Sequence, residues 1–114
     1  MENKRQPTER PHPTGLVYDE LYALHEVPAS HPESPRRLDA VLAGLDEPAL
    51  AARLVRVPAR DATEDELIDV HLPRYVRTVR DEVAAGQHSL STGDTDIGPH
   101  SYAAALRAAG GVCA

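Results

Sequence analysis

Histidine is the residue type in this chain most suited to metal or acid–base chemistry. A zinc site needs several ligands at recurring spacings, such as two histidines on one helix face. The six histidines show no such pair, and no cysteine or carboxylate supplies the other half of a site: they are His12, His25, His31, His71, His88 and His100. The spacing argues against a metal site. We predict that His71, which separates two expected helices, is a hydrogen-bonded junction residue.

The candidate nucleophiles lack an activating context. The serines have no Gly-x-Ser-x-Gly frame, and Cys113 follows an alanine-rich stretch without a charged activator. Gly110-Gly111 lacks the strand and lysine of a phosphate loop. Asp94 and Asp96 could pair as carboxylates, but their Gly/Ser/Thr-rich surroundings favour a turn-capping role. We therefore predict no catalytic residue and no metal ligand in the chain.

The stretch His-Pro-Glu-Ser-Pro-Arg-Arg-Leu at residues 31–38 predicts a stiff loop that leads into a helix. Pro32 and Pro35 each fix φ near −65°, so Ser34 is expected as the N-cap and Pro35 as the first helical residue. The apolar residues that follow have the spacing of a buried helix face: Leu38, Val41, Leu42 and Leu45. Such a loop would hold His31 in place, either for a substrate or for the protein's own core.

The remaining pattern predicts two strands and several helices. Strands are expected over 14–19, buried on both faces, and over 54–57, whereas 20–26 is ambiguous between a helical turn and a loop. Short helices are expected over 48–53 and after the Thr63/Glu66 capping box. A longer helix with an inward face of Tyr75, Val76, Val79 and Val83 runs from Pro73 to a glycine cap at Gly86. A polar loop over 87–98 precedes a last helix that starts at Pro99 or Ser101, whose small residues would allow close approach.

Two parallel strands cannot close an α/β sheet, so residues 14–114 are expected to be part of a larger domain. Residues 1–13 are polar and rich in proline, and we predict a disordered lead-in there. The net charge of −6 argues against a nucleic-acid partner, and no apolar run suits a membrane span. We predict a soluble cytoplasmic protein. Without Phe or Trp, and with a partial sheet, the isolated chain is expected to aggregate or be molten.

Residues 31–38 resemble the His-Pro-Glu-x-Pro-x-Arg-Leu segment of zinc-dependent histone deacetylase family proteins. This family includes histone deacetylase-like amidohydrolases, acetoin utilisation deacetylases and acetylpolyamine amidohydrolases. Three further segments resemble family motifs in the same order: Thr14–Asp19, Val70-His71 with Tyr75-Val76, and Gly93–Thr95 with Ser101–Gly111. The resemblance spans residues 14–114.

The resemblance implies an α/β fold, the N-terminal part of an arginase/deacetylase-type parallel-sheet domain that stops before the metal site. It implies a zinc-dependent enzyme acting on acylated lysines or polyamines, whose zinc ligands lie outside this chain. Within the chain it implies three substrate-rim residues, His31, Pro32 and Asp94, with Asp96 an open alternative to Asp94. We accordingly predict neither hydrolysis nor bound zinc for the chain alone.

Two other interpretations remain open at this stage. The chain could be a small non-catalytic protein that retains the deacetylase entry region and acts as a binding or regulatory partner. It could also be an ordinary small α/β domain whose motif matches are coincidental. The sequence indicates no oligomeric state.

Overall fold

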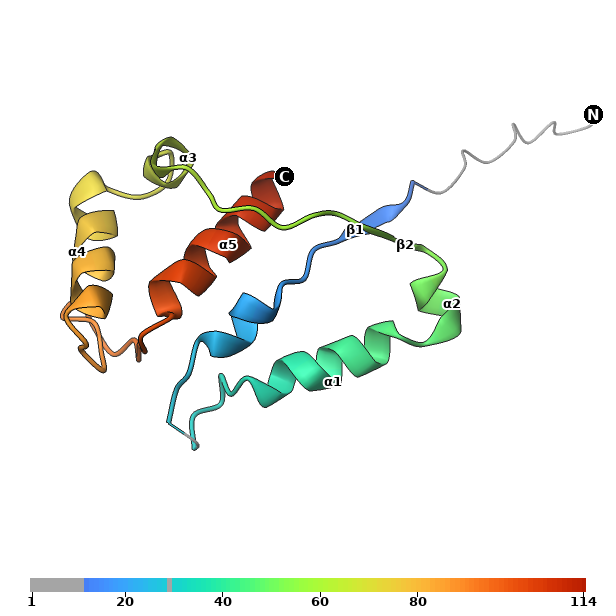
Figure 1. The fold of residues 1–114 in the computed structure, drawn as a ribbon, viewed down its shortest axis with the longest axis horizontal. Helices are drawn as coiled ribbons and strands as arrows, with labels where there is room; N and C mark the ends of the chain where they lie inside the picture. The colour runs from blue at the N-terminus through green and yellow to red at the C-terminus, as the bar shows by residue number, and fades with distance from the viewer. Residues whose placement is uncertain (1–11, 29) are drawn as a thin grey trace, which may run out of the picture.

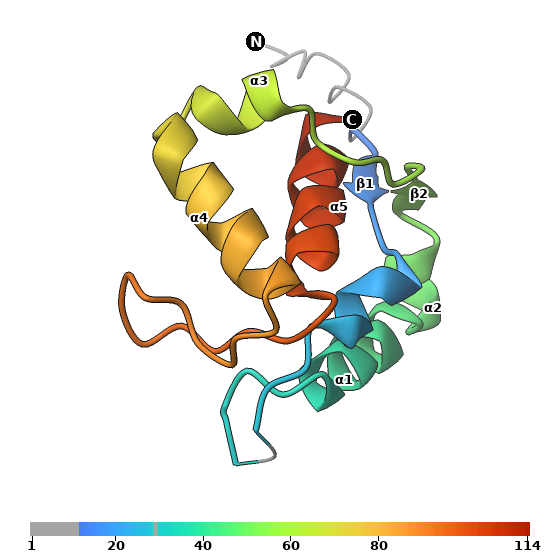
Figure 2. The same cartoon turned by 60° about the vertical axis from the view of Figure 1, so that its left-hand side comes forward.

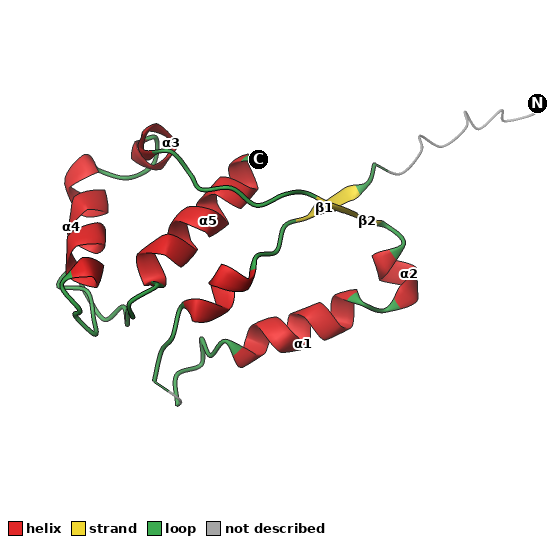
Figure 3. Cartoon of the chain, in the orientation of Figure 1, coloured by secondary structure: helices red, strands yellow, loops and turns green. Residues whose placement is uncertain are grey.

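The computed structural model describes residues 12–28 and 30–114. Figure 3 shows short strands and helices joined by long loops. The elements in chain order are β1 (Thr14–Leu16), the 3-10 helix η1 (Glu20–Leu24), α1 (Arg36–Leu45), α2 (Pro48–Ala51), β2 (Leu54–Arg56), α3 (Glu64–Ile68), α4 (Pro73–Ala84) and α5 (Ser101–Cys113). The expected lead-in lies outside the described residues up to residue 11, and His12 and Pro13 have no regular secondary structure.

The two strands pair in parallel, with Thr14 opposite Leu54 and Leu16 opposite Arg56. Parallel neighbours need a crossover connection, and η1, α1 and α2 supply it (Figure 1). The α/β prediction is therefore confirmed. The strands are shorter than expected, however, and the burial on both faces expected for the first strand is wrong, because Thr14 and Gly15 are exposed and Leu16 is only half-buried.

Helix α1 has the predicted apolar stripe but not the predicted burial. It begins at Arg36, one residue later than expected, and the Ser34 hydroxyl accepts the Arg36 N–H at 3.3 Å. Val41 is 56% exposed. The three leucines of the stripe, Leu38, Leu42 and Leu45, are only half-buried. The expected burial fails because no other described element packs extensively along this helix.

The core lies instead between α4, α5 and the segment that joins them (Figure 2). Its centre is a cluster of Val83, Leu90 and Ile97, against which Val79 and Tyr102 pack. Two of these residues come from the stretch expected to be a polar loop. Leu90 and Ile97 are only 4% and 6% exposed, so that stretch is a structural element.

Residues 87–98 form a hairpin, called here the 87–98 hairpin. The Leu90 N–H donates to the Thr95 carbonyl at 2.9 Å, and the Ile97 N–H donates to the His88 carbonyl at 3.0 Å. Ser89 and Asp96 form an antiparallel bridge between these bonds. The expected polar loop is thus folded into a hairpin, because one apolar residue on each arm turns inward and anchors it on the core.

Two glycines let α5 lie directly against the chain, as its small residues predict. A Cβ at Gly110 would lie 2.0 Å from the Arg60 carbonyl oxygen, and one at Gly111 would lie 2.6 Å from a Val17 methyl group. The Ala62 N–H donates to the Leu106 carbonyl at 2.9 Å, which holds this close contact. Helix α5 is thereby held against the two segments that follow β1 and β2.

Arg107 adds a charged connection at the same place. Its guanidinium donates to Asp19, after β1, at 2.9 Å and to Asp61, after β2, at 2.7 Å. The Tyr22 hydroxyl of η1 donates to the Arg107 carbonyl at 3.2 Å. Arg107 therefore connects α5 to two parts of the chain that are distant in sequence, residues 19–22 and Asp61.

The predicted helix boundaries hold best where local signals are strong. Thr63 and Glu66 form the complete capping box, α4 begins at Pro73, and Gly86 follows α4 with φ of +79°. The expected inward position of Tyr75 is wrong, because this residue is 37% exposed while Val76 and Val83 are buried. In the part of the chain that the structure describes, no helix is both long and apolar enough to cross a bilayer.

Candidate substrate-rim site

The loop of residues 30–35, called here the His31 loop, is held by local hydrogen bonds. The His31 N–H donates to the Pro28 carbonyl at 2.8 Å, and its ring Nδ1 accepts the Glu33 N–H at 3.1 Å. Because Nδ1 is an acceptor, the proton of the neutral ring lies on Nε2. Pro32 is exposed, so the loop presents a proline and an oriented imidazole.

The His31 loop meets the 87–98 hairpin. His31 Nε2, the nitrogen that carries the proton, lies 3.4 Å from Asp96 Oδ2, and both side chains are about 30% exposed. Asp94 lies near the hairpin tip and is exposed. Of the two aspartates left open by the sequence, the structure brings Asp96 to His31. Figure 2 shows both loops at the end of the molecule away from the C-terminus.

His25 and Ser101 form a second link beneath the hairpin. His25 Nδ1 lies 2.7 Å from Ser101 Oγ, and the Gly98 N–H donates to the same oxygen at 2.7 Å. Ser101 is buried. This hydroxyl is occupied at the start of α5, so it joins η1, the hairpin and α5 and does not form a nucleophile elbow.

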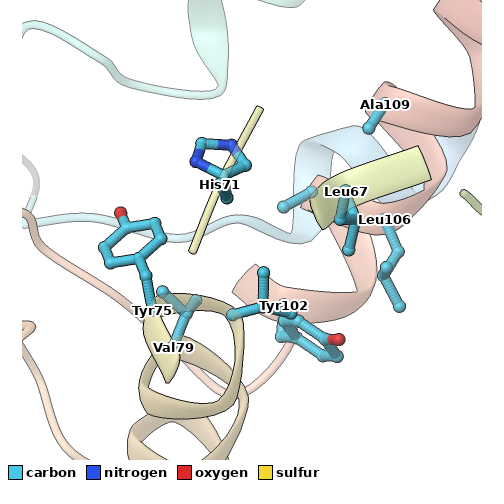
Figure 4. Close-up of a pocket in the computed structure, with 9 residues that line it drawn as sticks. Leu67, His71, Tyr75, Val79, Tyr102, Leu106 and Ala109 are labelled. Atoms are coloured by element: carbon cyan, nitrogen blue, oxygen red, sulfur yellow. The ribbon is translucent and has the colours of Figure 1, made fainter. Parts of the chain in front are cut away.

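His71 lies at the α3–α4 junction as predicted, but its ring is exposed and only its backbone N–H is bonded, to the Leu67 carbonyl at 3.0 Å. The ring centroid lies 5.4 Å from that of Tyr75. Figure 4 shows both rings at a pocket of about 220 Å³ between α3, α4 and α5. The walls of this pocket are almost entirely apolar, and include Leu67, Val79, Tyr102, Leu106 and Ala109.

Cys113 is not an activated thiol. A hydrogen bond with Glu66 and then desolvation raise the pKa of the Cys113 thiol above its ordinary value. The thiolate is the nucleophilic form, so the raised pKa keeps this group unreactive at neutral pH. Glu66 itself is engaged by Arg60 at 2.8 Å.

His31, the hairpin and helix α5 all lie within one stretch that matches a family model. A model of the histone deacetylase domain matches residues 31–114, well over half of the chain. The chain belongs to the histone deacetylase family. This match excludes the interpretation of coincidental motifs.

Relatives of this histone deacetylase family chain include two deacetylases. It is 40% identical over 81 residues to Polyamine deacetylase HDAC10 of Homo sapiens, covering 68% of this chain and 12% of that protein. It is 33% identical over 100 residues to a Probable deacetylase of Archaeoglobus fulgidus, covering 86% of this chain and 27% of that protein. The chain therefore spans only a small part of these relatives.

The fold has a solved counterpart in the same family. The crystal structure of the HDA15 HD domain matches with a TM-score of 0.71 and 34% identity, over 86% of this chain and 29% of that chain. The α/β arrangement of this histone deacetylase family chain is thus similar to part of that solved structure.

The described residues do not fit the zinc site that the family resemblance implies. Among residues 12–28 and 30–114, no three His, Cys, Asp or Glu side chains lie close enough to hold one ion. His31 contacts Asp96, and His25 contacts Ser101.

The sequence left open which aspartate of the hairpin lies at His31, and it did not predict one side-chain contact. Asp96 could not be separated from Asp94, and the contact between Glu82 and Ser91 was not predicted. A usable signal existed for the hairpin: Leu90 and Ile97 flank a turn-forming segment that contains Gly93, as hairpin arms do. No sequence signal marks the Glu82–Ser91 contact.

Proposed function

We propose that this chain supplies the substrate-entry rim of a deacetylase domain that acts on acylated lysines or polyamines. The observation that carries the proposal is the His31–Asp96 contact, which joins the His31 loop to the 87–98 hairpin at one surface. The deacetylase relatives support the reaction class. The family resemblance implies a zinc ion. Other residues of such a domain would bind it, and it would supply the hydrolytic chemistry.

The rim suits recognition because its groups are oriented in advance. A carboxylate is an acceptor for a substrate amide N–H. Asp96 offers one oxygen to His31, and its second oxygen remains a candidate for a substrate donor. Holding the acceptor in place reduces the entropy lost on binding. We therefore assign the rim carboxylate to Asp96, with His31 and Pro32 on the facing loop, rather than to Asp94.

A chimeric enzyme tests this assignment. Residues 14–114 would replace the matching segment of the Archaeoglobus fulgidus deacetylase, and kcat and KM would be measured with an acetyl-lysine peptide and an acetylated polyamine. We expect Asp96→Asn to raise KM about tenfold, since a hydrogen bond to a charged group contributes about 1.5 kcal/mol. The matched control Asp94→Asn should leave KM within about twofold. The opposite order would assign the rim to Asp94.

Pro32 gives a second test in the same chimera. Pro32→Ala should loosen the His31 loop and raise KM, while zinc content stays unchanged, because Pro32 lies on the rim loop. Lost zinc with an unchanged KM would show that the loop supports the metal site instead. For the 114-residue chain alone we predict no turnover and no stoichiometric zinc.

A non-catalytic binding protein is the second candidate, and the incompletely covered apolar stripe of α1 favours it. The DNA after codon 114 separates the two. An open frame that continues into further histone deacetylase domain sequence supports the deacetylase segment. A stop codon followed by an unrelated gene supports the binding protein. A cytoplasmic location remains a prediction of the sequence for both.

A further inference from the structure

We propose that Glu82 is a positioning residue that orients the 87–98 hairpin so that Asp96 faces His31. The proposal rests on the proposed rim for its functional meaning. Its geometric basis is separate, because it concerns a contact between α4 and the hairpin that involves none of the family motifs.

Glu82 holds the hairpin through both carboxylate oxygens. The Ser91 N–H donates to Oε2 at 2.9 Å, and the Ser91 hydroxyl donates to Oε1. The Gln87 N–H also donates to the Glu82 backbone carbonyl at 3.2 Å. A single helical residue thus contacts the hairpin at its base and along its first arm.

The position of Glu82 in its helix indicates a tertiary role. It lies in the last turn of α4, which ends at Ala84. The carbonyl end of a helix disfavours a negative charge, so this carboxylate is unfavourable for the isolated helix. The contact with Ser91 offsets that effect. Its neighbour Asp81 pairs only with Arg80 of the same helix and is 69% exposed, which makes it a matched control.

The apolar anchor of the hairpin does not orient it by itself. Leu90 and Ile97 pack into the core, but apolar contact is non-directional. Hydrogen bonds to a carboxylate are directional and short. Because Ser89 pairs with Asp96 across the hairpin, fixing Ser91 two residues further along the same arm sets the direction in which Asp96 points.

Nuclear magnetic resonance on the chimeric deacetylase domain that carries residues 14–114 tests the proposal by two readouts. One is hydrogen exchange of the Ser91 amide, with the Leu90 and Ile97 amides as internal references. The other is the nuclear Overhauser contact between the His31 ring and the Asp96 β-protons. We expect Glu82→Ala to speed Ser91 exchange about tenfold or more and to remove the His31–Asp96 contact, while the references change less than about twofold.

Conservative variants separate positioning from general destabilisation. Ser91→Ala should give a smaller effect than Glu82→Ala because its backbone N–H remains, and Ser91→Thr should restore the contact because it keeps the hydroxyl. Asp81→Ala should change neither readout. The proposal is overturned if the wild-type Ser91 amide is unprotected, if all hairpin amides change together, or if the His31–Asp96 contact survives Glu82→Ala. None of these results bears on deacetylation, so the proposed function stands or fails separately.

Discussion

Helices α1 and α4 have similar apolar patterns but differ in how far their apolar side chains are buried. Helix α4 and the 87–98 hairpin bury Val76, Val83, Leu90 and Ile97. Helix α1 carries an equally regular apolar stripe, yet none of its residues is buried. The difference shows that an amphipathic pattern specifies a face to be covered, and that covering it needs a partner surface at the right place.

The polar contacts follow the same division. Ion pairs and side-chain hydrogen bonds that join distant segments gather around α5 and the hairpin, through Arg107, Ser101 and His31. Around α1 the side-chain hydrogen bonds given by the described residues are local, such as that of Ser34. The exposed α1 stripe is the surface behind the prediction that the isolated chain aggregates or is molten, which stays a prediction.

The largest contrast is expected from core truncation. Leu90→Ala should lower the free energy of opening of the α4–hairpin–α5 region by about 3 kcal/mol, because it leaves a cavity in the cluster with Val83 and Ile97. Val41→Ala on α1 should change stability by less than about 0.5 kcal/mol, since that side chain is exposed. Amide hydrogen exchange measures both. Equal effects would mean that α1 is covered in solution.

Two glycine-to-alanine substitutions should give the next largest difference, because their effects on stability have opposite signs. Gly110→Ala should destabilise the packed region by about 2–3 kcal/mol, because the new methyl group would lie 2.0 Å from the Arg60 carbonyl oxygen. Gly44→Ala in α1 should stabilise that helix by up to about 1 kcal/mol, because nothing lies within 4 Å of the new methyl group. Urea titration followed by circular dichroism reports both, and a stabilising Gly110→Ala would contradict the close packing of α5.

Acid should weaken the packed region first. The Leu21 N–H, followed by Arg107, lowers the pKa of Asp19, and Arg60, followed by the Thr63 N–H, lowers the pKa of Glu66. A carboxyl with a lower pKa in the folded state stabilises it above the ordinary values of 3.8 and 4.5, and loses that effect as pH falls toward the folded pKa.

The check is the unfolding midpoint of the α5 region followed below about pH 5. Glu66→Gln should flatten the acid limb, while the exposed Glu64→Gln of the same helix serves as the control. A steep acid limb that is unchanged in Glu66→Gln would assign it to other groups.

Helix caps give the smallest contrast. Thr63→Ala should cost about 1 kcal/mol, because it breaks a complete capping box. Ser34→Ala at the start of α1 should cost less than about 0.5 kcal/mol, since the Ser34 hydroxyl makes only one long bond, at 3.3 Å. The helical content of α3 and α1 in the two variants measures this. A larger loss from Ser34→Ala would identify Ser34 as the stronger cap.

Features set by neighbouring residues were predictable from the sequence. The capping box at Thr63, the start of α4 at Pro73 and the left-handed Gly86 each depend on groups within one helical turn. The parallel strand pair followed from the alternation of strands and helices, and the family followed from ordered motifs. These inferences hold because backbone preferences and short-range hydrogen bonds act within the local sequence.

Only the tertiary structure decided which groups meet. His25 reaches Ser101 across 76 residues, and Asp96 rather than Asp94 comes to His31. The hairpin was missed because Leu90 and Ile97 become buried only when α4 and α5 flank them. Burial and long-range pairing depend on the position of distant surfaces, whereas the pattern of a helix depends on its own residues. The sequence alone therefore determined where prolines restrict the backbone of the His31 loop, and the fold determined what that loop faces.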